Sequence, residues 1–349
     1  MPAMTDPAPK DAGLLDLRIQ TACFLIITTI LVALALFWLK SVMIPFVLAL
    51  FLAAGLAPLA DFQIRWLRFP KALAVFMTFL VSMALLALSV AVVSSAVAQL
   101  AASASAYQDR LGHLLDWAAR TLPLEHLGVS RDDLLRPLSR LPSGTVSGFL
   151  LGTTNAILEL TSQGLLVTVF LVFLLIGLTG QRSQSLDVWT EMESRVKGFI
   201  VMKTLISAVT GVLVGVTLEL LGVELALAFG FFAFLLNFIP TLGSLISTLL
   251  PLPVVLMNPE LSTTGAILAI VIPGAIHFAI GNLVEPLVMG DSLELHPVAL
   301  LLSLMIWGAI WGVVGMLLAA PITAVLKILS ERIEPTRPLG RMLAGHLRD

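Results

Sequence analysis

Two short motifs in the second half of the chain place polar groups and helix breakers inside very apolar sequence. The first, Asn-Phe-Ile-Pro-Thr-Leu-Gly, contains Asn237, Pro240, Thr241 and Gly243. Pro240 has no backbone N–H and frees a carbonyl about four residues earlier, while Gly243 permits close approach of another backbone. The Asn237 carboxamide can cap the freed groups or hydrogen-bond a solute. The motif predicts an interrupted helix.

The second motif, Gly-Asn-Leu-Val-Glu-Pro, contains Asn282, Glu285 and Pro286. Asn282 and Glu285 are three residues apart and would share a helix face, and Pro286 would end or kink that helix. A carboxylate at the centre of a membrane costs about 2.5–3.5 kcal/mol, so we expect Glu285 to face protein, water or a ligand. Interrupted helices recur at the solute sites of transporters because they expose backbone dipoles. Both motifs therefore predict parts of a solute pathway.

Each of these polar residues also has a structural interpretation. Asn237 and Asn282 are compatible with interhelical hydrogen bonds, worth about 0.6–2 kcal/mol each. Glu285 is compatible with a purely structural partner, either a backbone N–H or Lys203. That lysine lies near the end of a predicted span, where its ammonium can also snorkel to the surface. The sequence leaves both interpretations open.

Two histidines are further candidates for a proton or ion relay with Glu285. His277 lies in an apolar stretch, where a buried core histidine is the alternative. His296 follows Asp291 and Glu294, and a solvated loop is the alternative there. The five histidines lack the spacing of metal ligands, and no P-loop, H-E-x-x-H or G-x-S-x-G motif occurs. We expect no metal, no cofactor and no enzymatic activity.

The composition sets the class of protein. Of the 349 residues 58% are hydrophobic and only 12% are charged, about half the charged fraction of soluble domains. The mean hydropathy is +1.02. A net charge of −2 gives no reason to expect nucleic-acid binding, and the single Cys23 excludes an intramolecular disulfide. The chain is predicted to be an all-α, polytopic membrane protein.

Apolar runs predict about eight transmembrane helices, several of them broken by Pro or Gly. The expected spans are Ile19–Leu39, Val42–Ala60, Ala72–Leu100, Val146–Gly180, Gly198–Leu221, Leu225–Met257, Gly265–Gly290 and Pro297–Ile328. The sixth is interrupted at Pro240, and the seventh at Pro273-Gly274. A proline-broken segment can instead be re-entrant, which would lower the count by one or two. Glycines spaced three or four residues apart predict close helix packing; they are Gly211, Gly215, Gly308, Gly312 and Gly315.

The predicted organisation has five parts. Residues 1–18 form a tail, 19–100 the first three helices, 101–145 an extramembrane amphipathic segment, 146–329 the transport core and 330–349 a second tail. The segment 101–145 is either a gate over a pathway or a structural connection. The distribution of Lys and Arg predicts that both tails are cytoplasmic.

With these motifs the chain resembles the AI-2E family of bacterial inner-membrane permeases. The matching elements, in order, are Leu221-Gly222-Val223, Leu225–Pro240 with the first motif, Gly281–Gly290, Leu295-His296-Pro297 and Trp311-Gly312-x-x-Gly315 through Pro321. It departs from the family at Leu287, where many members have a basic residue, and at Thr241, where an aromatic residue is common.

The resemblance implies export or facilitated diffusion of a small polar metabolite such as autoinducer-2. Other members resemble sodium/proton antiporters, in which Glu285 would be the exchanging carboxylate. A third hypothesis is a non-transporting oligomeric scaffold that binds partners through residues 101–145. The expected partners are a small polar solute or ion, the lipid bilayer and further copies of the chain.

Overall fold

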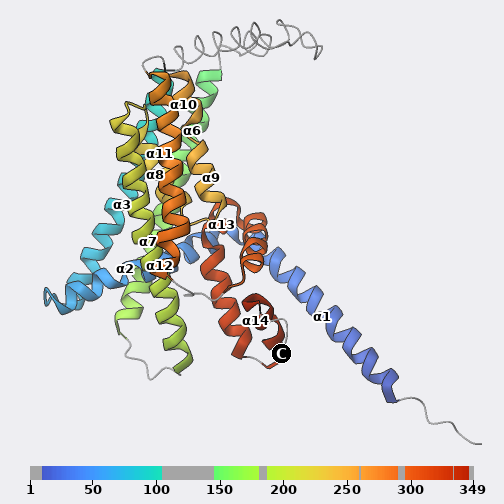
Figure 1. Ribbon diagram of the computed structural model, residues 1–349. Coiled ribbons are helices and arrows are strands. Elements are labelled where there is room, and N and C mark those ends of the chain that lie inside the picture. Colours follow the sequence, from blue (N-terminus) through green and yellow to red (C-terminus); the bar gives the residue numbers. More distant parts are fainter. Residues whose placement is uncertain are drawn as a thin grey trace, which may run out of the picture.

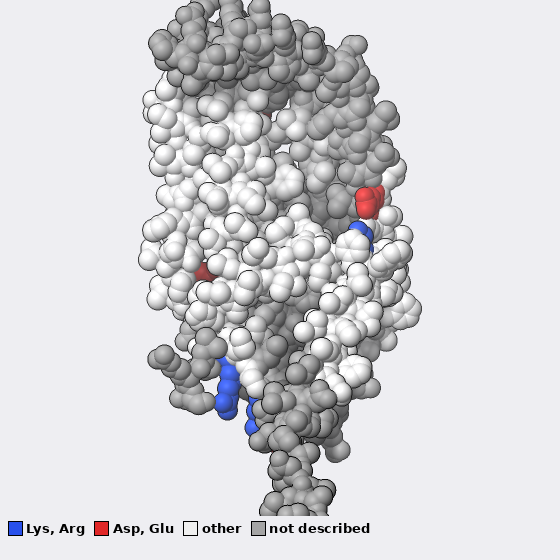
Figure 2. Space-filling view, turned by 90° about the vertical axis from the view of Figure 1, so that its right-hand side faces the viewer, with Lys and Arg blue, Asp and Glu red and all other residues white. Residues whose placement is uncertain are grey.

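The computed structural model describes residues 10–103, 145–180, 187–258, 261–289, 295–332 and 334–345. Every regular element in these ranges is a helix. Five helical stretches are long and apolar enough to cross a membrane: Lys40–Arg65, Lys71–Ala102, Val196–Leu220, Thr263–Met289 and Pro297–Arg332. Figure 2 shows a broad face on which charged side chains are few among the described residues. The prediction of an all-α polytopic membrane protein is confirmed.

The chain as far as Leu220 supplies long helices. They are α1 (Lys10–Trp38), α2 (Lys40–Arg65), α3 (Lys71–Ala102), α6 (Thr145–Gly180) and α7 (Asp187–Leu220). Helix α1 projects away from the bundle (Figure 1). Helices α2 and α6 pack through small and branched apolar side chains, including Ala49, Ala53 and Leu171. Of the predicted extramembrane segment, residues 104–144 lie outside the described residues.

The predicted sixth span is a helical hairpin, built from α8 (Ala226–Leu236), α9 (Leu242–Leu249) and α10 (Leu252–Met257). Its two ends lie together, because the Asn258 side-chain amide donates to the Gly222 carbonyl at 3.3 Å. Its tip lies beside Ser207, which is 13 residues before the end of α7 and therefore about 20 Å from that end. A side chain at Gly243 would overlap the Leu236 carbonyl, so the two arms touch. The segment enters and leaves at the same end of the bundle.

The predicted seventh span is continuous but not regular. Helix α11 (Thr263–Ala279) runs without a break through Pro273. The expected interruption at Pro273-Gly274 is therefore wrong. The irregularity comes later, in the π-helical segment η2 (Ile280–Val284), which leads into the short α12 (Glu285–Met289). There the Glu285 N–H donates to the Ile280 carbonyl, so one extra residue enters the turn immediately before Pro286.

The predicted eighth span also reverses. Helix α13 (Pro297–Arg332) is interrupted at Gly312, where φ is +63° and ψ is −143°. Leu304 and Ala319 pack in one cluster, although a continuous helix would separate them by about 22 Å. Glycine is required at the reversal because L side chains rarely adopt such a backbone conformation. The 3₁₀ segment η3 (Glu334–Thr336) and α14 (Arg337–Ala344) then close the base, where the Leu343 carbonyl accepts the His296 backbone N–H at 2.9 Å.

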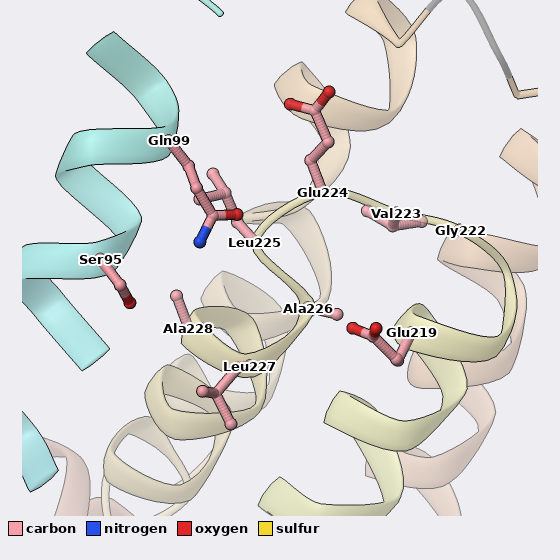
Figure 3. A pocket seen from close by; sticks show the side chains of 10 residues that line it. All are labelled: Ser95, Gln99, Glu219, Gly222, Val223, Glu224, Leu225, Ala226, Leu227 and Ala228. Carbon is pink, nitrogen blue, oxygen red and sulfur yellow. The ribbon is translucent and has the colours of Figure 1, made fainter. Parts of the chain in front are cut away.

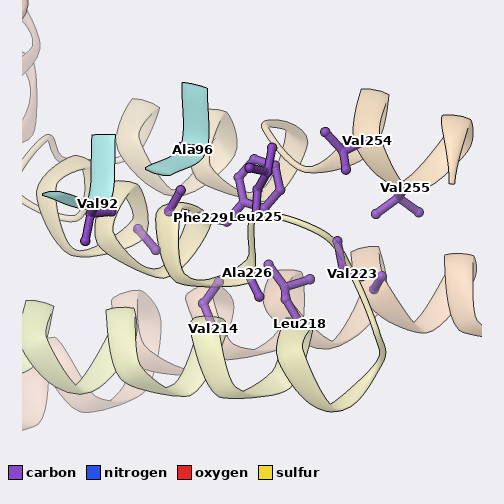
Figure 4. Packing of buried hydrophobic residues seen from close by; sticks show 13 residues of the cluster. Val92, Ala96, Val214, Leu218, Val223, Leu225, Ala226, Phe229, Val254 and Val255 are labelled. Carbon is purple, nitrogen blue, oxygen red and sulfur yellow. The ribbon is translucent and has the colours of Figure 1, made fainter. Parts of the chain in front are cut away.

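The two hairpins point toward each other from opposite ends of the bundle (Figure 1). Ile239, at the tip of the α8–α10 hairpin, packs with Leu304 and Ala319 of α13. At the end of the bundle where the α8–α10 hairpin enters and leaves, a larger apolar cluster joins α3, α7, α8, α10 and α11 (Figure 4). The predicted close packing at Gly211 and Gly215 is confirmed, since both face Gly230 of α8. This packing fixes the position of the hairpin against α7.

Candidate solute pathway

The tip of the α8–α10 hairpin is a strained turn. The Leu242 N–H donates to the Pro240 carbonyl at 2.6 Å, and Thr241 between them has φ +62° and ψ −55°. These are the features of a γ-turn with positive φ, a rare conformation for a residue with a side chain. Thr241 is exposed, Pro240 is half-buried and Gly243 is buried. The sequence predicted the interruption correctly and left open whether the segment spans the membrane or is re-entrant.

Asn237 lies at the end of α8 and is held by α7. Its side-chain amide donates to the Ser207 hydroxyl at 3.0 Å, and both side chains are buried. This is the interhelical hydrogen bond that the sequence allowed as the alternative. Ser207 was not predicted as a site residue. The signal that could have found it is the spacing of Lys203, Ser207 and Thr210, three polar residues at i, i+4 and i+7 in an apolar helix.

Glu285 forms an ion pair with Lys203 of α7. Lys203 is only 3% exposed, so it does not snorkel to a surface, and that expectation is wrong. The Glu285 side chain is 27% exposed. An ammonium buried to this degree is stable only with a charged or strongly polar partner. The pair therefore joins the spanning helix α7 to the segment that follows the π-helical turn.

Asn282 does not join this ion pair. Its side chain is exposed and donates to the Phe278 carbonyl of its own helix at 3.0 Å. The π-helical turn between Asn282 and Glu285 changes the angular offset that three residues have in an α-helix. The shared face expected from the spacing is thus altered locally. A contact between Asn282 and solute stays a prediction.

The two histidines of the predicted relay lie in different surroundings. His277 is buried, and its Nε2 lies 3.0 Å from the hydroxyl of Ser247, which links α11 to α9. Its Nδ1 has no hydrogen-bond partner among the described residues. His296 is exposed at the start of α13 and contacts α14 through Leu343 and Gly345. Asp291 and Glu294 lie outside the described residues.

Three polar pairs thus connect the core: Asn237–Ser207, His277–Ser247 and Lys203–Glu285. The first two tie an arm of the hairpin to a neighbouring helix, and the third ties α7 to α12. Within the described part of the chain, His, Cys, Asp and Glu form no group of three that could hold a metal ion. The arrangement is suited to hydrogen bonding and charge pairing with a solute.

A cavity of about 400 Å³ opens at the end where the hairpin enters. Figure 3 shows Ser95 and Gln99 of α3 on one side and Glu219 of α7 and Glu224 of the α7–α8 turn on the other. The Ser103 hydroxyl donates to a Glu224 carboxylate oxygen at 3.3 Å. No sequence motif predicted this cavity, because its two walls are more than a hundred residues apart in the sequence.

Known proteins resemble this chain over most of its length. The model of the AI-2E family transporters matches residues 25–334. The AI-2 transport protein TqsA of Escherichia coli (strain K12) is 30% identical over 299 residues, which cover 84% of this chain and 86% of TqsA. YhhT of Escherichia coli (strain K12) is 30% identical over 344 residues, or 94% of this chain and 93% of YhhT. This chain belongs to the AI-2E family, a family of transporters and not of enzymes.

Proposed function

We propose that this protein is a permease that moves a small polar metabolite, such as autoinducer-2, across the bacterial inner membrane. The observation that carries the proposal is the tip of the α8–α10 hairpin. The strained turn at Thr241, the buried Asn237 carboxamide and the buried Ser207 hydroxyl lie together there, next to the hairpin formed by α13. Family membership and the name of TqsA as an AI-2 transport protein support the choice of solute.

In this proposal the hairpin motif and the π-helical segment line one pathway. Asn237 hydrogen-bonds the solute, and Pro240, Thr241 and Gly243 form the turn that exposes backbone groups to it. On the other segment Asn282 is a second hydrogen-bonding group, Glu285 the orienting or coupling charge, and Pro286 the helix breaker. His277 and His296 are candidate relay groups. The cavity beside Glu219 and Glu224 is the entrance at the end where the hairpin enters.

Both termini are proposed to be cytoplasmic. Each re-entrant hairpin returns to the side from which it came, and the two replace two predicted spans. Removing two crossings leaves both chain ends on the same side of the membrane. The basic residues at the α14 end, among them Arg332, Arg337 and Arg341, support a cytoplasmic placement of that end.

A sodium/proton antiporter that uses Glu285 is the second candidate, and one observation favours it. Lys203 occupies the position beside Glu285 that a bound cation would take. A carboxylate that exchanges cations must give up one positive partner for another, and a buried lysine can serve as one of them.

The experiment is flux in proteoliposomes of the purified protein. Labelled autoinducer-2 and internal pH are followed in parallel, with and without a sodium gradient, for the wild type and Glu285→Gln. Autoinducer-2 movement without a sodium-dependent pH change supports the permease. Sodium-driven proton movement that Glu285→Gln abolishes supports the antiporter. Neither signal, from protein that is monodisperse and thermally stable, would reject both.

A further inference from the structure

The ammonium of Lys203 is a deeply buried positive charge near the proposed pathway. The residue is 3% exposed and lies on α7, which packs against α2, α8, α11 and α13. Glu285 is the partner that the structure gives it. Because an uncompensated charge at this depth is strongly unfavourable, Lys203 must hold an anionic or strongly accepting group in every stable state.

The two members of the ion pair are anchored very differently. Lys203 belongs to a helix of 34 residues, whereas Glu285 begins a helix of five residues between a π-helical turn and Pro286. The side chains next to Glu285 pack little against the rest of the protein, with Leu283 57% and Leu287 85% exposed. A rearrangement of this segment would therefore move the carboxylate and leave the ammonium in place.

Lys203 also lies within reach of the proposed solute groups. Ser207 is one helical turn further along α7, so the two side chains share a face of that helix. The Ser207 hydroxyl binds the Asn237 amide at the tip of the hairpin. A solute at Asn237 and Ser207 thus lies about one turn, or 5 Å, along α7 from the ammonium.

We propose that Lys203 is a solute-binding residue and that the transported solute is a small organic anion that also carries hydroxyl or carbonyl groups. Its anionic group takes the place of the Glu285 carboxylate on the ammonium, and its hydroxyl or carbonyl groups bind Ser207 and Asn237. This inference rests on the proposed permease function and names the substrate class of the same pathway.

The test compares two solutes that differ in one end group, which is charged in one solute and neutral in the other. Labelled ribonate and labelled ribitol have the same five-carbon chain, with a carboxylate in ribonate where ribitol has a hydroxymethyl group. Initial uptake into proteoliposomes is measured with the membrane potential clamped at zero, together with labelled autoinducer-2. The wild type should favour ribonate by about tenfold or more, because the hydroxymethyl group of ribitol cannot displace the Glu285 carboxylate from the Lys203 ammonium, so ribitol lacks that part of the site.

The variants separate solute binding from folding. Lys203→Gln combined with Glu285→Gln removes both charges without leaving either unpaired, and it should lower ribonate uptake more than ribitol uptake, so that the ribonate-to-ribitol ratio falls to about one. Lys203→Arg keeps the positive charge and should keep the preference. The matched control is Lys197→Gln, since Lys197 lies six residues earlier on α7 and pairs with Asp61 at 3.1 Å.

Equal uptake of the two solutes by the wild type would overturn the inference, as would a preference that survives in the double variant. Transport of autoinducer-2 without transport of ribonate would also overturn it and would leave the permease function standing. No transport of any of the three solutes by folded protein would overturn the inference together with the permease function.

Discussion

Replacing Gly211 by alanine should separate α7 from α8 and disturb the proposed pathway one turn away. A Cβ atom at position 211 would lie 2.7 Å from the Gly230 carbonyl oxygen and 2.8 Å from the Phe234 Cβ. Ordinary contact begins at 3.4 Å, so the helices must move apart by about 0.7 Å. Overpacking of this kind costs about 1–3 kcal/mol. The backbone oxygen of Gly230 cannot rotate away, which places the expected cost at the upper end.

The separation of α7 from α8 should also affect the Ser207–Asn237 hydrogen bond. Ser207 is one turn from Gly211 and Asn237 is three residues from Phe234, so their 3.0 Å hydrogen bond should lengthen to about 3.7 Å and break. We expect Gly211→Ala to lower the thermal unfolding temperature in detergent by about 5 °C and to reduce solute uptake in proteoliposomes.

The control for this variant lies on the same helix. A Cβ atom at Gly198 has no neighbouring atom within 4 Å, so Gly198→Ala should leave stability and uptake close to those of the wild type. A Gly211→Ala protein with wild-type stability and uptake would refute the close packing of α7 on α8 and its coupling to the site.

Three further predictions test other parts of the structure. Glu285→Leu leaves the buried Lys203 ammonium without its partner and should destabilise the protein by about 3–5 kcal/mol, whereas Glu285→Leu with Lys203→Met should be nearly neutral. Thermal unfolding in detergent measures the difference, and equal stability of the two variants would argue against the buried pair. Thr241→Gly should stabilise the protein by about 1 kcal/mol because it removes the positive-φ strain, and a lower unfolding temperature would contradict the strained turn. In a cysteine-free background, cysteines at the exposed positions 222 and 262, which flank the hairpin, should react with an impermeant maleimide from the same side of the membrane, and labelling from opposite sides would exclude the re-entrant hairpin.

The sequence was sufficient for the class of fold because backbone groups in lipid must bond within a helix or a closed barrel, and the apolar runs here have helical lengths. It was not sufficient for the path of the chain. Leu225–Met257 and Pro297–Ile328 are each long enough to span, and apolar length is the same for a crossing and for two packed arms. The difference lies in single residues, the positive φ of Thr241 and of Gly312, which composition does not reveal.

The candidate site was predictable in its primary positions and not in its partners. Asn237 and Glu285 were recognised from the sequence because a polar group in an apolar run is energetically costly and usually has a function or a polar partner. Ser207 and Ser247, which bind Asn237 and His277, did not stand out, because a serine in a membrane helix ordinarily bonds its own backbone. Lys203 was recognised as a possible partner of Glu285, yet only the packing of α12 on α7 brings the two together.

The re-entrant hairpin has a consequence for how the protein is made. Its tip carries backbone carbonyl and N–H groups that lipid cannot satisfy, so it is stable at membrane depth only between protein walls. One wall, α7, precedes it in the chain, but the other, α11, is synthesised afterwards. The hairpin must therefore wait at the membrane surface, or in the insertion machinery, until α11 has crossed. Biogenesis of this transporter cannot proceed strictly in chain order.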